Sequence, residues 1–401
     1  MQIRKGILAP IQRRESAVTA DFSKRISIEP VSAVFIGSGE KIGKFETIVQ
    51  GKKTHILNFD KLMEHEKFVD YFVANSDKIF NPETKDAVLL KIFEVLKIDL
   101  QEYSYTSFDT IFDKNGKPKT LQISRFIRTA GRYYIPGSSL KGALRTMIIK
   151  SNQKFEATLR NVFRSPNVKF EVEKVEQNIF GQPFYSPFKL LRITDSTFIN
   201  NSHIKFKKVE VVHFVRQKTS IPQFVEVWLP DMRSNEGNKV AAEIISLFSN
   251  LSKLESLEEV RRNEKLKEAL GYFRNLFSNE KVFVDRMKES AMIIINMERQ
   301  KISTMSDNPV KKTLEEFYKK LLDINEKADR GFLVRIGGHT SFYSKTAFRG
   351  FLEPAEIKVL KNFGYRKITE SNFPITTRIV KLSESPNDIM PLGWVKVELM
   401  D

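Results

Sequence analysis

The chain contains no cysteine among its 401 residues, which excludes disulfides, thiolate zinc sites and cysteine nucleophiles. It has five histidines, and no two of them stand at the spacing of a metal-ligand pair. No segment approaches the roughly 20 consecutive apolar residues that a membrane-spanning helix requires. Residues 1–14 are basic and lack the apolar run of a secretory signal. We therefore expect a cytoplasmic protein that needs no metal or cofactor and contacts no membrane.

Positive charge is in clear excess. Lysine and arginine number 66 against 49 acidic residues, giving a formal net charge of +17 and a pI near 9.6. A surplus of this size favours a polyanionic partner. It does not by itself distinguish RNA, DNA and acidic lipid, and a highly charged surface without such a partner has the same composition.

Residues 134–145 predict a loop that leads into a helix. Ser138 or Ser139 would cap that helix by accepting from its free N–H groups. Lys141 and Arg145 are one turn apart, so they share one face beside the apolar stripe. Two cations near a helix N-terminus form a phosphate-binding surface. The alternative is an ordinary capped helix with solvated charges.

Two glycine-rich segments are further candidates for contact with a nucleic acid. The first, at residues 37–43, lacks the glycine of a dinucleotide fingerprint and the Gly-Lys-Ser/Thr of a P-loop. We expect it to meet RNA phosphates through backbone amides and a lysine. The second, at residues 335–345, surrounds two adjacent glycines with donors. The candidate contacts are Gly37, Ser38, Gly39, Lys41, Arg335, Gly337, Gly338, His339, Lys345 and, further on, Arg378.

Residues 103–132 are predicted to form an insertion with a turn at residues 115–118. Its return arm carries Arg125, Arg128 and Arg132 with aromatic residues between them. Such an arm suits contact with an RNA backbone together with base stacking. An exposed hairpin without a ligand explains the same pattern.

The order of the expected elements predicts an α+β fold of two domains. A strand, a helix and two further strands in the first part match the start of a ferredoxin-like, or RRM-like, unit. Apolar residues then recur at helical spacing. We expect an RRM-like domain at residues 1–235 and a helix-rich domain with the second glycine-rich loop at residues 236–401. The expected elements are strands at 25–29, 190–193, 209–215, 224–229 and 394–399, and helical regions at 60–96, interrupted by Pro82, and 238–329.

Several segments, in the expected order, resemble the RAMP superfamily, the repeat-associated mysterious proteins of CRISPR–Cas effector complexes. The sharpest is Ile-Pro-Gly-Ser-Ser-Leu-Lys-Gly-Ala-Leu-Arg at residues 135–145, which resembles the signature helix. The weaker ones are the first strand and glycine turn (28–39), a strand ending in Asp-Ser (191–196) and the late glycine-rich loop (332–346). Residues 391–395 resemble the ending of one subgroup, the fifth Csm subunit of type III-A complexes.

This resemblance implies a non-catalytic subunit that holds the 3′ region of the crRNA at one end of the complex. Its expected partners are the crRNA, the neighbouring Csm backbone subunits and cellular nucleases that trim the crRNA. Some RAMP proteins cleave crRNA precursors, so an endoribonuclease with His339 as general base is the alternative. The turn after the first strand offers no aspartate of the kind with which backbone subunits cut target RNA. A nucleotide-using enzyme lacks every phosphate-loop motif.

Overall fold

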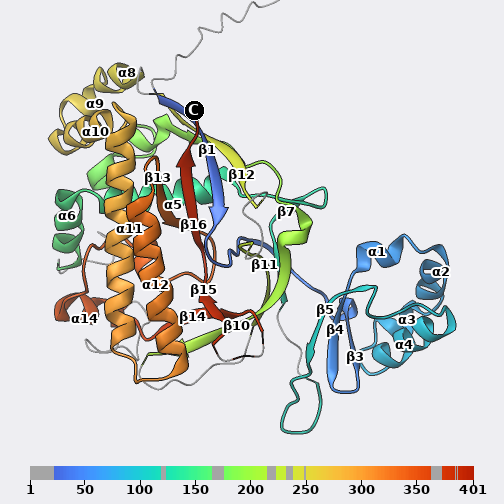
Figure 1. Ribbon diagram of the computed structural model, residues 1–401. Helices are drawn as coiled ribbons and strands as arrows, with labels where there is room; N and C mark the ends of the chain where they lie inside the picture. The colour runs from blue at the N-terminus through green and yellow to red at the C-terminus, as the bar shows by residue number, and fades with distance from the viewer. Residues whose placement is uncertain are drawn as a thin grey trace, which may run out of the picture.

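The expected α+β class is confirmed. Two large sheets and the helices packed on them make up the body of the molecule, and a smaller lobe projects from it (Figure 1). The chain folds this way because apolar strands and amphipathic helices bury one face each against a common core. The computed structural model describes residues 22–118, 123–164, 176–214, 223–231, 238–247, 250–362, 373–383, 385 and 387–401.

The first sheet has five antiparallel strands and forms the centre of the body. Its middle strand, β1 (Phe22–Pro30), pairs with two strands from the second half of the chain. The sheet therefore combines strands from both sides of residue 235. Its order is β13 (Gly331–Arg335), β16 (Trp394–Leu399), β1, β12 (Val240–Ser246) and β9 (Leu191–Ile193).

The second sheet has six strands, and one of its edges differs from our expectation. Residues 37–39 were expected to be a turn that ends the first strand, but they begin an edge strand, β2 (Gly37–Lys41). This strand pairs with β6 through an irregular register, which explains its glycines. The order is β15 (Ile389–Pro391), β14 (Thr376–Lys381), β10 (Ile204–His213), β11 (Gln223–Trp228), β6 (Ile123–Phe126) and β2.

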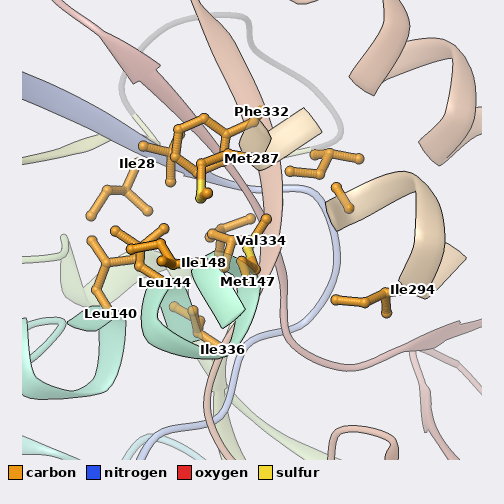
Figure 2. Packing of buried hydrophobic residues seen from close by; sticks show 14 of the residues in the cluster. Ile28, Leu140, Leu144, Met147, Ile148, Met287, Ile294, Phe332, Val334 and Ile336 are labelled. Carbon is orange, nitrogen blue, oxygen red and sulfur yellow. The ribbon is translucent and has the colours of Figure 1, made fainter. Parts of the chain in front are cut away.

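The signature segment forms helix α5 (Gly137–Lys150), and its apolar face packs into the main core. Leu140, Leu144 and Met147 lie together with side chains of β1, β13 and helix α11 (Glu280–Ser303) (Figure 2). Helix α12 (Pro309–Lys327) runs beside α11 and also packs against β13 and β15 (Figure 1). Burial of this continuous apolar cluster holds α5 in place, because each Å² of apolar surface removed from water contributes roughly 25 cal/mol to the stability of the fold.

The helical character of the second half is confirmed, with one correction. The helical pattern was expected to begin at residue 238, but Val240–Ser246 is strand β12, with alternate residues buried. Pairing with β1 decides this segment, because a short apolar run fits either structure. No helix in the described residues is long and apolar enough to cross a bilayer. The other helices of the body are α6 (Gln153–Phe163), α8 (Leu251–Glu255), α9 (Glu258–Arg261), α10 (Glu264–Leu276), α13 (Phe342–Lys345) and α14 (Pro354–Asn362).

The smaller lobe has its own sheet and its own apolar core. Pro82 lies between two of its helices, as expected. The expected turn at residues 115–118 is present, with a bridge between Phe112 and Pro118, but the two arms then separate into different sheets. The lobe consists of β3 (Thr47–Gln50), β4 (Lys53–Leu57), β5 (Ser104–Asp109), α1 (Phe59–Met63), α2 (Glu66–Ala74), α3 (Ser76–Ile79) and α4 (Lys85–Val95).

Candidate nucleic-acid interface

Three segments that the sequence singled out meet at one open groove of about 460 Å³. They are the start of β2, the first turns of α5, and the glycine-rich loop that follows β13. In the sequence these segments are about 100 and 200 residues apart, and the two sheets and α5 bring them together. The groove is lined by Ile36, Gly37, Ser138, Ser139, Gly142, Ala143, Thr146, Arg335, Ile336, Gly337, Gly338, Thr340, Ser344 and Lys345.

Helix α5 presents a face of small residues to the groove. Ser138, Gly142 and Thr146 recur at intervals of four residues, so they lie opposite the buried stripe. A β-carbon added to Gly142 would meet no atom within 4 Å, so the backbone of α5 is directly open to the groove. A chain of phosphates can therefore approach this helix closely.

The N-terminus of α5 is capped differently from our expectation. Neither Ser138 nor Ser139 accepts a capping hydrogen bond. The N–H of Gly137 instead donates to Asp195 Oδ1 at 2.7 Å, and the N–H of Ile135 donates to Ser196 Oγ at 2.9 Å. The Asp-Ser pair after β9 thus fixes the entry of the helix, which leaves the two serine hydroxyls facing the groove.

Glycines in the second loop are required by internal packing. A β-carbon on Gly337, whose φ is +82°, would lie 2.1 Å from the carbonyl oxygen of Phe35. The N–H of Gly338 donates to the same oxygen at 2.7 Å. The His339 ring stacks on the Phe35 ring with centroids 5.2 Å apart. The loop is therefore held against the segment that leads into β2, which forms one wall of the groove.

A buried ion pair holds the other side of this loop. Glu298 of α11 accepts from Arg335, from the Tyr318 hydroxyl and from the Ser341 hydroxyl. Arg335 also donates from Nε to the Leu392 carbonyl at 2.7 Å. Burial raises the pKa of Tyr318, so its hydroxyl remains a donor to the carboxylate. We expected Arg335 to contact RNA, and the structure gives its guanidinium these partners in the interior.

Cations surround the loop end of the groove. Burial, and then the neighbouring Arg378 and Arg335, lower the pKa of Lys345. Burial, and then Arg378 and Lys345, lower the pKa of His339 to about 4, so its imidazole is neutral at pH 7. No acidic side chain of the described residues pairs with Lys345. Within the described residues, the positive potential at this end is therefore not neutralised by an acidic partner of Lys345, and it suits an anion.

A second group of cations lies along the edge of α5. Burial, and then Arg145 and Arg192, lower the pKa of Lys141. Lys141 has no acidic partner among the described residues, whereas Arg145 pairs with Glu176 and lies over a phenylalanine ring. Lys141 and Arg145 share the edge beside Ser138, as the spacing predicted.

The basic arm of the insertion lies outside the groove lining. Arg125 is buried and paired with Glu46, and Arg128 pairs with Asp60 at 3.2 Å. Arg132 is exposed and lies over the Phe198 ring at 4.9 Å. Of the β2 candidates, Gly37 lines the groove, whereas Ser38, Gly39 and Lys41 continue along the sheet edge.

Several groove residues were missed from the sequence. Gly142, Ala143 and Thr146 could have been found, because they follow Ser138 and Ser139 at helical spacing. Arg192, which raises the positive potential at Lys141, had no local signal.

Among the described residues, no acidic side chain lines the groove. In the part of the chain that the structure describes, no three histidine or acidic side chains are grouped so that they could hold a metal ion. The site therefore combines cations, hydroxyls and exposed backbone, which is the chemistry of phosphate binding.

Two relatives share the name CRISPR system Cms protein Csm5. One, from Methanocaldococcus jannaschii, is 26% identical over 409 residues, covering 94% of this chain and 89% of its own length. The other, from Streptococcus thermophilus, is 25% identical over 198 residues, covering 45% of this chain and 53% of its own length.

Two solved structures share the fold. The crystal structure of Csm5 from T. onnurineus aligns over 92% of this chain and 99% of its own, with a TM-score of 0.60 and 21% identity. A chain of the cryo-EM structure of a type III-A Csm–crRNA–target RNA ternary complex aligns over 94% of this chain and 100% of its own, with a TM-score of 0.61 and 22% identity. The RAMP superfamily matches residues 27–344, which is most of the sequence and includes all three walls of the groove. The chain belongs to the RAMP superfamily.

Proposed function

We propose that this protein is a crRNA-binding subunit of a type III-A Csm effector complex. It holds the 3′ region of the crRNA at one end of that complex and supports maturation of the 3′ end. Base pairing by the crRNA supplies sequence specificity, while the protein binds the RNA backbone. Neighbouring Csm backbone subunits and trimming nucleases are its protein partners.

The convergence of α5, β2 and the glycine-rich loop on one acid-free groove carries this proposal. Relatives named Csm5 and a fold shared with a chain of a Csm–crRNA–target RNA complex support it. The contacts with phosphates are assigned to the groove and its edges, at Gly37, Ser138, Ser139, Lys141, Gly338 and Lys345. Arg125 and Arg335, whose guanidinium groups are paired inside the protein, position the walls of the groove.

Purification of a tagged copy from its own cells tests membership in the complex. We expect the other Csm subunits to co-purify with it in the presence of RNase inhibitor, together with crRNA of defined length. Recovery of the protein alone, or with RNA that contains no CRISPR repeat sequence, would contradict the proposal. A tagged copy with Lys141→Ala and Lys345→Ala serves as comparison and should recover crRNA with a less defined or shorter 3′ end.

We further propose that the subunit is not a nuclease. The one histidine beside the groove, His339, has its pKa lowered to about 4, whereas an efficient general base titrates near the working pH. RNA cleavage also needs a second group to protonate the leaving oxygen, and the described groove lining offers neither a carboxylic acid nor a histidine for this. His339 packs on Phe35 and shapes the loop.

Incubation of pure protein with a crRNA precursor decides between the scaffold and the nuclease. We expect no cleavage with or without divalent metal ions, for both the wild-type protein and His339→Ala. Cleavage by the wild-type protein that His339→Ala abolishes, with RNA affinity unchanged, would favour the endoribonuclease instead. His203→Ala controls for the loss of a histidine elsewhere in the chain.

A further inference from the structure

The inserted lobe, defined here as residues 44–110, differs in charge from the rest of the protein. It contains nine lysines and no arginine against twelve acidic residues, a net charge of −3. The remaining residues contain 57 basic and 37 acidic side chains, a net charge of +20. An acidic lobe repels phosphates, so the lobe is unsuited to the RNA that the rest of the molecule attracts.

Exposed apolar side chains are concentrated on the same lobe. Single exposed apolar residues are normal on any protein, but a concentration of them indicates a contact surface. The lobe is one sixth of the chain, yet it carries five of the ten large apolar side chains that are exposed in the described residues. These five are Met63, Tyr71, Val73, Phe80 and Val95.

Phe80, at the end of α3, has the features of an anchor residue. Its side chain is 60% exposed, yet its ring is held edge-on by Phe45 at 5.8 Å and by Phe72 at 6.2 Å. A ring that is already fixed loses little conformational entropy when a partner covers it. Aromatic side chains in such positions carry much of the binding energy of protein interfaces.

Unpaired acidic residues flank this anchor. Asp77 and Glu83 lie three residues before and after Phe80, and both are exposed. Neither they nor Asp70 on α2 lies within ion-pair distance of a basic side chain in the described part of the chain. The surface therefore offers an aromatic ring with acidic side chains before and after it in the sequence, beside one exposed lysine, Lys78.

We propose that this lobe is a protein-docking module that binds a basic surface with an apolar recess on another protein subunit of the same RNA-bound assembly. The inference rests on the proposed function. Subunits that share one RNA carry basic surfaces, which complement the acidic side chains that flank Phe80. The lobe projects from the body (Figure 1), which it contacts through Tyr105 and Phe108, and none of its residues lines the groove. A partner therefore reaches the helices of the lobe without covering the groove. The groove binds RNA and the lobe binds protein.

A photo-crosslinking amino acid at position 80 identifies the class of the partner. Phe80→p-benzoylphenylalanine in the full-length chain is expressed together with the other subunits and the crRNA. The product is irradiated and then digested with nuclease or with protease. We expect a crosslink to a protein subunit that resists nuclease. A crosslink that nuclease removes, or no crosslink at all, would overturn the proposal.

Alanine substitution measures the strength of the contact. Phe80→Ala should weaken incorporation of the chain into the assembly on the order of tenfold or more, while its affinity for crRNA stays unchanged. The double substitution Asp77→Lys and Glu83→Lys, which leaves the apolar core intact, should act in the same direction. The matched control is Phe184→Ala, since Phe184 is also 60% exposed but lies outside the lobe. Unchanged incorporation of Phe80→Ala would refute the docking role, whereas loss of crRNA in all variants would refute the proposed function.

Discussion

Replacing Gly142 by glutamate is expected to lower the affinity for RNA on the order of tenfold to a hundredfold while the fold remains intact. Gly142 lines the groove, and a β-carbon at this position meets no atom within 4 Å. The new side chain therefore extends into the groove and places a negative charge where phosphates approach. Substitution of a helical glycine by a better helix former does not destabilise the helix.

Two control variants separate the effect of the glutamate charge from the effect of its size and from the effect of an added negative charge anywhere on the protein. Gly142→Gln has the same size without the charge, so it should lose less affinity than Gly142→Glu. Gly271→Glu makes the same change at an exposed glycine of α10, where a β-carbon also meets no atom, and should bind RNA as the wild type does. Fluorescence anisotropy with a labelled crRNA measures the affinities. Equal affinity for all three variants would remove this face of α5 from the interface.

Glu298→Ala is expected to destabilise the protein by about 3–5 kcal/mol, because it leaves the Arg335 charge buried without a partner. The Arg335 side chain is 1% exposed, and Glu298 also accepts from Tyr318 and Ser341. Loss of this carboxylate should release the glycine-rich loop and weaken RNA binding as well. Chemical denaturation gives the free energy of unfolding.

A double substitution shows whether the unpaired charge is the cause. Glu298→Met combined with Arg335→Met removes both charges and should cost less than Glu298→Ala alone. Asp323→Ala, which breaks an exposed pair with Lys327 on α12, should leave the free energy of unfolding nearly unchanged, because water screens a pair at the surface. If the double variant loses as much free energy of unfolding as Glu298→Met and Arg335→Met lose separately, added together, then packing and not charge dominates at this site.

Local signals in the sequence predicted two of the three walls of the groove, helix α5 and the glycine-rich loop, but not strand β2. The apolar stripe of α5 and the strand at Trp394–Leu399 follow from the periodicity of their side chains alone. The glycines at 337 and 338 were recognised as positions of close approach, although the groups they approach are the backbone and the ring of Phe35 rather than a ligand.

What the sequence could not predict depends on contacts between distant residues. Asp195, which caps α5, is 58 residues from Gly137, and Glu298 is 37 residues from Arg335. No local pattern distinguishes an arginine that faces RNA from one that is paired inside the protein. Strand β12 was wrongly predicted as helix from the spacing of its apolar residues, because that spacing carries no information about its pairing with β1, more than 200 residues earlier.

The salt dependence of crRNA binding tests most directly whether the groove binds RNA phosphates. We expect the affinity of the wild type for crRNA to fall steeply as salt rises. The double variant Lys141→Ala and Lys345→Ala should bind more weakly. Its slope of log affinity against log salt concentration should be shallower by about 1.4, since each phosphate contact on a single strand contributes about 0.7. The control Lys267→Ala and Lys327→Ala removes the same net charge from ion pairs elsewhere and should keep the wild-type slope. RNA binding at this groove would be contradicted if the log–log slope were unchanged in the Lys141→Ala and Lys345→Ala variant. It would also be contradicted if the slope became equally shallow in the control.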